Sequence, residues 1–349
     1  MKKIVTVILL VFTMVGILAF SGCTDPAERA EVDLTFDGLG LKPPEEIASA
    51  ATPVDSSKIT LSSEVTTDKA VLESIRYLLK LSNQNNIDAE FYAAAGYGTG
   101  EAYIPSANLV GSMDTREWRI YDNGEYFFDS YRLVVEGYSK KDDGSKGDVP
   151  SGIVSIISNV LNFTERVYSP DSQTFYKLKD GKSSVDSFKK YPSLDAIIYK
   201  KPKPEVTSVD EYIKQNYYRN SFKDYITDDL DYEECITEGS LTYDAVNGIY
   251  TLTCEINCEN EIALDLSIQS MKKSASTDIF KYARKSLTIE IWECGLIKKY
   301  VNDNRWEAEL LGYLEGSSEN YYEQIFAYDA NLIEVMQVSD EIKNAVMGK

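Results

Sequence analysis

Two segments of this chain alternate strictly between apolar and polar residues, and no other feature constrains the fold as much. One segment runs from Tyr250 to Asn257 and the other from Leu287 to Ile291. Successive side chains of a β-strand point to opposite faces, so each segment has one apolar and one polar face. We therefore predict an α+β fold built on an antiparallel β-sheet that is curved like a half-barrel. Its concave side is expected to be covered by a few helices or to hold an apolar ligand.

Tight turns punctuate the predicted sheet. Asp122-Asn123-Gly124 separates strand segments 117–121 and 125–131, and Asn247-Gly248 separates 240–243 and 249–257. Asn and Gly tolerate the positive φ of a hairpin turn. Residues 174–178 before Asp180-Gly181 form another hairpin arm. The predicted meander continues through segments 261–270, 286–292, 296–301, 307–314 and 321–328.

Helical spacing appears at four places. Val71, Leu72, Ile75, Leu78, Leu79 and Ser82 form one face of a helix that starts near Thr67 and ends near residues 83–86. A short helix is predicted at 153–161 and a capped helix from Ser208 to about Tyr218, with Glu211 completing the capping box. The chain closes with a helix capped at Ser339. The polar segment 139–150 is predicted to be a mobile loop.

The N-terminus resembles the signal of a bacterial lipoprotein precursor. Lys2 and Lys3 precede an uncharged run, and Gly22 precedes Cys23. This resemblance implies cleavage before Cys23 and attachment of an acyl lipid, such as palmitate, to its thiol. The protein would then be extracytoplasmic and anchored to the membrane by lipid. An uncleaved signal anchor is the alternative.

The predicted organisation has four parts. Residues 1–22 form the signal peptide and 23–65 a flexible tether. Residues 66–200 form a helix with antiparallel strands, and 201–349 form a helix with an antiparallel meander. The Lys- and Pro-rich stretch 200–204 reads as a linker between these halves, although 66–349 can equally form one continuous domain.

Charge and the absence of histidine exclude several functions. The formal net charge is -20, with 36 basic and 56 acidic residues, so nucleic acid is not an expected partner. The chain has no histidine, which removes the commonest general base and most zinc sites. We therefore expect a protein that is not an enzyme and that has no cofactor, no catalytic residue and no resident metal.

Four cysteines remain after Cys23. An even number of cysteines in an exported protein favours one or two disulfides, and their pairing is left open. Direct pairing of Cys254 with Cys258 is disfavoured because they lie four residues apart on one extended strand. Free thiols and a four-cysteine zinc site are the alternatives. The candidates are Cys235, Cys254, Cys258 and Cys294.

Three further motifs have a structural and a functional interpretation. The acidic run 228–234 has calcium-type ligands but lacks the order of an EF-hand, so a solvated turn is favoured. Gly96-Tyr97-Gly98-Thr99-Gly100 lacks a following lysine, so a flexible turn or sheet edge is favoured over a phosphate site. Trp292 is out of parity with Ile289 and Ile291, which places it on the polar face.

The segment 248–328 resembles the half-barrel superfamily of lipoprotein and lipid carriers (LolA-like and LppX-like proteins). The best match is Ser286–Trp292, which turns through Cys294-Gly295 into Leu296–Tyr300. The resemblance implies a concave cavity for acyl chains or hydrophobic peptides and no catalytic residues. The expected ligand-binding residues are Tyr250, Leu252, Ile256, Leu287, Ile289 and Ile291.

These observations favour a lipid-anchored protein that binds or carries a hydrophobic ligand, either a lipid or an acylated peptide. The first alternative is a structural or regulatory lipoprotein that docks another envelope protein. The second is a cell-wall enzyme that uses carboxylates.

Overall fold

A computed structural model describes residues 38–141, 143–170, 175–178, 188–191, 235–260, 268, 277, 279–310 and 314–332. Its strands are β1 (Ser62–Thr66), β2 (Phe91–Ile104), β3 (Leu109–Asp122), β4 (Glu125–Lys140), β5 (Lys146–Gly147), β6 (Phe163–Ser169), β7 (Phe175–Leu178), β8 (Phe188–Tyr191), β9 (Ile236–Asp244), β10 (Ile249–Ile256), β11 (Phe280–Trp292), β12 (Ile297–Leu310) and β13 (Leu314–Ala327). Its α-helices are α2 (Glu45–Ala50), α3 (Lys69–Asp88) and α4 (Ser151–Leu161), and its 3₁₀ turns are η2 (Ser56–Lys58), η3 (Pro105–Ala107) and η6 (Ala330–Leu332).

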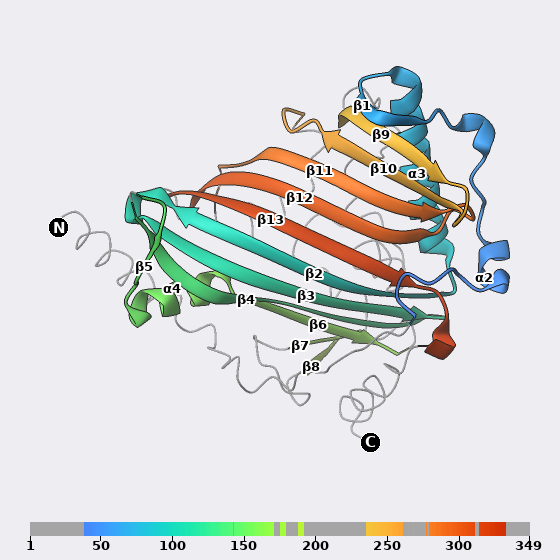
Figure 1. Ribbon diagram of the computed structural model, residues 1–349. Coiled ribbons are helices and arrows are strands. Elements are labelled where there is room, and N and C mark those ends of the chain that lie inside the picture. The colour runs from blue at the N-terminus through green and yellow to red at the C-terminus, as the bar shows by residue number, and fades with distance from the viewer. Residues whose placement is uncertain are drawn as a thin grey trace.

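All of these strands belong to one antiparallel sheet. The strand order is β1-β9-β10-β11-β12-β13-β2-β3-β4-β6-β7-β8, and β5 pairs with β4. Figure 1 shows the sheet twisted and curved, with α3 packed at its β9–β12 end. The predicted fold class, a curved antiparallel sheet with a few helices, is confirmed.

Strands from both predicted halves meet in the middle of this sheet. β13 pairs with β2 along eleven residue pairs, from Ser317 opposite Tyr103 to Ala327 opposite Ala93. The linker at 200–204, the helix at 208–218, the strand at 261–270 (apart from Ile268) and the helix capped at Ser339 lie outside the described residues.

The predicted amphipathic helix is α3. Its N-cap Asp68 accepts a hydrogen bond from the backbone N–H of Ala70, and its buried positions include every predicted apolar residue. It ends at Asp88, slightly later than expected. The predicted hairpin turn also forms, because Asn123 (φ 44°) and Gly124 (φ 95°) adopt the positive φ that their short or absent side chains permit.

The predicted tether is wrong from Gly38 onward, because this segment is bonded to the rest of the fold. The backbone N–H of Gly40 donates to the carbonyl of Phe326, and β1 pairs with β9. Thr52 exchanges two hydrogen bonds with the Asn85 side chain of α3, at 3.0 and 2.8 Å. Polar and Pro-rich composition concealed a segment that is held by hydrogen bonds and by apolar side chains, such as Ile47 and Val54, packed against the core.

Three other local predictions need correction. The predicted loop 139–150 contains β5, which pairs with the end of β4. The segments 296–301 and 307–314 are not separate strands, because β12 runs unbroken from Ile297 to Leu310. β2 was not predicted as a strand, and its glycine motif lies inside it, bonded to a neighbour on each side.

The sheet has two faces, which we name by their contents. The inner face carries α3 and a large apolar cluster that includes Leu79, Leu252 and Ile289. The outer face is mostly polar and bears surface ion pairs such as Arg284–Asp303 and Lys299–Glu323. A smaller apolar cluster lies on the outer face around Ile120 and Phe127.

Candidate functional site

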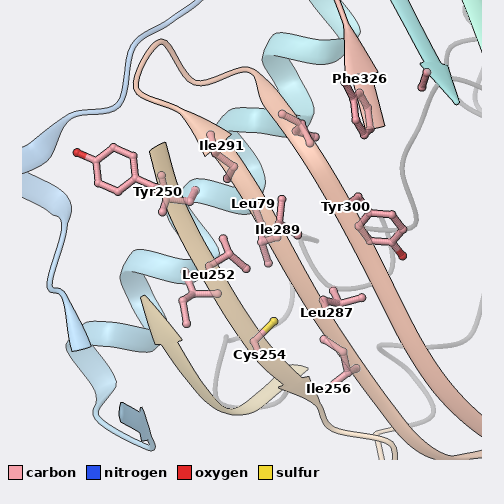
Figure 2. Close-up of a cluster of buried hydrophobic side chains, with 14 of the residues drawn as sticks. Leu79, Tyr250, Leu252, Cys254, Ile256, Leu287, Ile289, Ile291, Tyr300 and Phe326 are labelled. Atoms are coloured by element: carbon pink, nitrogen blue, oxygen red, sulfur yellow. The ribbon is translucent and has the colours of Figure 1, made fainter. Parts of the chain in front are cut away.

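The six residues predicted to bind a ligand lie together on the inner face. Leu252 pairs with Ile289, and Tyr250 with Ile291, on neighbouring strands. Figure 2 shows Leu79 of α3 beside Ile289 in the same cluster. All six are buried, and Leu252, Leu287, Ile289 and Ile291 have no exposed surface at all. Their shared face follows from strand parity, and they pack directly against α3.

The energy of this packing argues that these residues are core. Val71, Leu72, Ile75, Leu78 and Leu79 of α3 are each at most 4% exposed. Burying five such side chains contributes roughly 8 to 15 kcal/mol, at ~1.5 to 3 kcal/mol each. That equals the whole net stability of a typical domain, about 5 to 15 kcal/mol. Lifting α3 off the sheet would forfeit a contribution of this size, which argues that these residues are core.

A second zone of the inner face is polar, and we call it the polar belt. It crosses β12, β13, β2 and β3 next to the apolar cluster. Strand register places Gln324 opposite both Tyr300 and Gly96, and Tyr322 opposite Asn302 and Gly98. The belt consists of Glu117, Asn302, Asn304, Ser318, Asn320, Tyr322 and Gln324.

Glu117 is the centre of the belt. Its Oε1 atom accepts hydrogen bonds from Arg119 Nε, from the Tyr322 hydroxyl (3.0 Å) and from Gln324 Nε2 (3.2 Å). Burial and the nearby Glu117 carboxylate raise the pKa of Tyr322 well above its usual value, which keeps this phenol neutral as a donor. Burial is the largest single effect on Arg119 and lowers its pKa, but Glu117 together with Tyr126, Tyr92 and Tyr322 outweighs it, so the net pKa shift of Arg119 is upward.

Three glycines of β2, Gly96, Gly98 and Gly100, lie on the inner face and leave space for this network. An ideal Cβ at Gly96 would lie 2.2 Å from the Tyr322 hydroxyl oxygen, and one at Gly100 would lie 2.5 Å from Asn320 Oδ1. Tyr322 therefore lies across β2 in space that any side chain at 96 would occupy. The glycine motif is neither a flexible turn nor a sheet edge; it is a strand segment whose missing side chains leave space for Tyr322.

Side-chain amides extend the belt toward the far end of the strands. Asn320 Nδ2 donates to Asn304 Oδ1 (3.2 Å), and the Ser318 hydroxyl donates to Asn320 Oδ1 (2.9 Å). Each amide offers donors and acceptors, so this row can hydrogen-bond either type of ligand group.

An aromatic cluster borders the belt on its other side. Phe280 stacks edge-on against Tyr282, with ring centroids 5.1 Å apart, and lies 5.6 Å from the Trp306 ring. Lys285, a buried inner-face residue opposite Asn304, places its ammonium 4.5 Å from the Tyr282 ring. Phe280 and Tyr282 belong to the same apolar cluster as Leu252 and Ile289, so this one cluster lies on both sides of the belt along the strands.

The four candidate cysteines form no disulfide in the structure, which describes all of them. Cys254 lies in the apolar cluster, while Cys294 lies in the turn between β11 and β12. Burial raises the pKa of the Cys254 thiol to about 12, which makes it unreactive. Burial also raises the pKa of Cys258, although the nearby Lys285 opposes the shift.

Other sequence-based candidates have different outcomes. Trp292 was predicted on the polar face, but it is 6% exposed and packs in the apolar cluster at the end of β11, where the Lys298 ammonium lies 5.5 Å from the centre of its ring. Cys23 and the acidic run 228–234 lie outside the described residues. Within the described ranges no three acidic or cysteine side chains gather as metal ligands would. No helix in the same ranges is long and apolar enough to span a membrane.

Side chains of the polar belt can hydrogen-bond to a ligand, but the contacts described for them include no pair of catalytic groups. Glu117 Oε1 already accepts three bonds, so it orients donors. The belt was not predicted from the sequence, although each of its strands carried a signal. Glu117 and Arg119, Tyr322 and Gln324, and the three glycines each alternate with a period of two. Only the register shows that they meet.

Comparisons with known proteins add little. No protein-family model matches this chain, and no curated protein matches it. Among solved structures, it is similar to the crystal structure of Neisserial surface protein A (NspA), with 6% sequence identity and a TM-score of 0.18. The match covers 68% of this chain and 97% of that chain. A TM-score this low supports no inference about fold or function.

Proposed function

We propose that this chain is an extracytoplasmic, lipid-anchored binding or carrier protein that holds an amphipathic ligand on the inner face of its sheet. The ligand class is a lipid or an acylated peptide. Its polar group would meet the belt around Glu117, and its apolar part would lie along the aromatic cluster of Phe280, Tyr282 and Trp306. The protein acts by binding, without catalysis.

The observation that carries this proposal is the belt itself. Polar groups inside a fold cost free energy unless they are hydrogen-bonded, and a buried charge costs more. Replacing a buried ion pair such as Glu117–Arg119 with apolar residues is often neutral or stabilising. A face that served only as core would be expected to be apolar here. Ligand sites combine apolar lining with a few placed polar groups, as this face does.

Native mass spectrometry of the protein starting at Thr24, which lacks the lipidation cysteine, tests the binding proposal. We expect a co-purifying lipid or acylated peptide. A double variant, Asn304→Leu with Asn320→Leu, should lose this adduct while keeping its far-ultraviolet circular dichroism. Asn331→Leu, which changes an exposed asparagine in η6, is the matched control and should keep the adduct. A wild-type protein with no adduct and no uptake of a fluorescent fatty acid would refute the proposal.

The anchor has a separate test. Cys23→Ala should abolish metabolic labelling with a palmitate analogue and leave the precursor uncleaved. Labelling that persists in this variant would refute lipidation at Cys23 without bearing on the ligand.

Docking to another envelope protein is the second candidate, and one outer-face feature favours it. Tyr97 and Tyr321 lie on the neighbouring strands β2 and β13 and are 37% and 38% exposed. The Arg116 guanidinium lies 4.0 Å from the centre of the Tyr97 ring. Exposed aromatic residues with arginine are typical of protein interfaces. Tyr97→Ser with Tyr321→Ser should abolish capture of a specific envelope protein if this candidate holds.

A further inference from the structure

A row of apolar side chains crosses the outer face, opposite α3. Its six members lie in register on β13, β2, β3, β4, β6 and β7 and are at most 7% exposed. We call them the outer row: Ala327, Ala93, Ile120, Phe127, Tyr168 and Tyr176. With neighbouring strands ~4.8 Å apart, the row is about 24 Å long.

Such a row needs a covering segment, because residues of the sheet itself cannot shield it from above. Of the described residues, Leu39, Ala95 and Trp118 pack against this cluster. Ala95 and Trp118 belong to β2 and β3 themselves. Leu39 follows Gly38, which lies beside Ala327 at one end of the row. The described residues therefore account for a cover at that end only.

We propose that the outer row is the docking surface for the chain's own C-terminal segment, residues 333–349. The last described residue, Leu332, lies at the Ala327 end of the row. An ideal Cβ on Gly38 would be 3.1 Å from Leu332 Cβ and 3.8 Å from Ala327 Cβ. The remaining chain thus begins where the row begins.

Length and pattern both fit this segment. It has seventeen residues: the ten that follow the predicted cap Ser339 reach about 15 Å as a helix at ~1.5 Å per residue, and residues 333–338 before the cap are long enough to span the rest of the row. Val338, Ile342, Ala345 and Val346 are spaced three or four apart, as on one face of a helix, whereas Asn344 falls on the opposite face. Docking here places the segment on the face opposite the polar belt.

Photo-cross-linking in the otherwise unaltered chain tests the docking. A photoreactive amino acid replaces Val346, and a matched control carries it in place of Asn344. We expect intramolecular cross-links from position 346 to segments 125–128, 167–169 or 175–178, near the far end of the row, in several-fold higher yield than from position 344. Cross-links to a second molecule would assign the row to a second copy and overturn the proposal. Cross-links to other segments, or equal yields from both positions, would overturn it as well.

A second measurement does not depend on cross-linking chemistry. Ile342→Asp should raise the fluorescence of an apolar dye several-fold and speed hydrogen exchange in β3 and β4, while Asn344→Asp should leave both unchanged. If Ile342→Asp leaves both unchanged, the segment does not cover the row.

Discussion

Gly96→Ala tests the geometry of the polar belt directly. An ideal Cβ at this position would lie 2.2 Å from the Tyr322 hydroxyl oxygen, 2.8 Å from Tyr322 Cζ and 3.1 Å from Glu117 Cβ. Carbon atoms that are not bonded do not approach so closely, so the phenol must move. Moving it breaks the 3.0 Å hydrogen bond between the Tyr322 hydroxyl and Glu117.

The cost can be estimated from these contacts. Losing a hydrogen bond to a charged group costs about 1.5 to 3 kcal/mol. Overpacking a filled site costs about 1 to 3 kcal/mol more. Alanine restricts the unfolded chain more than glycine does, which offsets roughly 0.5 to 1 kcal/mol. We expect Gly96→Ala to lower the free energy of unfolding by about 2 to 5 kcal/mol on these figures.

Urea unfolding of four proteins measures the effect: wild type, Gly96→Ala, Tyr322→Ala and the double variant. Removing the phenol opens space for the new methyl group, so Gly96→Ala should cost little or nothing in the Tyr322→Ala background. Gly152→Ala is the matched control, because an added Cβ there meets nothing within 4 Å. Equal effects of Gly96→Ala in both backgrounds, or a cost no larger than that of Gly152→Ala, would refute the proposed packing of Tyr322 over β2.

Three further predictions follow from the same side chains. Glu117→Gln should cost about 3 to 5 kcal/mol because it removes the carboxylate that pairs with the buried Arg119, whereas Glu117→Met with Arg119→Met should cost less than the single change. Urea unfolding measures both, and a double variant at least as unstable as Glu117→Gln contradicts this. Burial raises the pKa of Cys254 to about 12, so this thiol should be alkylated in the native protein far more slowly than that of the half-buried Cys294. Mass spectrometry measures the two rates, and equal rates argue against the burial of Cys254. Burial also raises the pKa of Tyr322 above its usual 10.0. The stabilisation contributed by the buried neutral phenol is therefore complete below pH 10.0 and is lost as pH rises through the higher pKa of the folded state. An ultraviolet titration should show fewer phenols ionising before unfolding in wild type than in a denatured control.

Local signals were sufficient to predict some elements of this fold. α3 could be predicted because its apolar face repeats with the helical period and Asp68 caps it. The turn at Asn123-Gly124 could be predicted because few other residues adopt positive φ at low cost. In both cases the deciding interactions lie within a few residues along the chain.

β2 could not be predicted in this way. Its sequence from Ala93 to Gly100 is mostly alanine and glycine, which have low intrinsic preference for strands, and only Tyr97 and Thr99 favour one. This strand forms because β13 and β3 hydrogen-bond along both of its sides and Tyr322 fills the space above its glycines. The stabilising groups come from distant parts of the chain, so a short window contains no sign of them.

The register also explains why the belt escaped detection. Tyr322 and Gln324 are separated from Glu117 by more than 200 residues, yet both bond to its carboxylate. Alternation within each strand shows which residues share a face, but it does not show which strands are neighbours. The shared face of Leu252 and Ile289 could be predicted, whereas their covering by α3 required the structure.

The position of the belt couples formation of the site to completion of the sheet. β13 and β2 are the strands at which the two predicted halves join, and Gln324 and Tyr322 reach Glu117 only when these strands pair. Either half alone would expose β2 or β13 as a long unpaired edge, which favours aggregation. The loop to be closed before this pairing is long, and contacts of such separation form slowly. The belt is therefore a property of the whole sheet, and neither half can be expected to form it by itself.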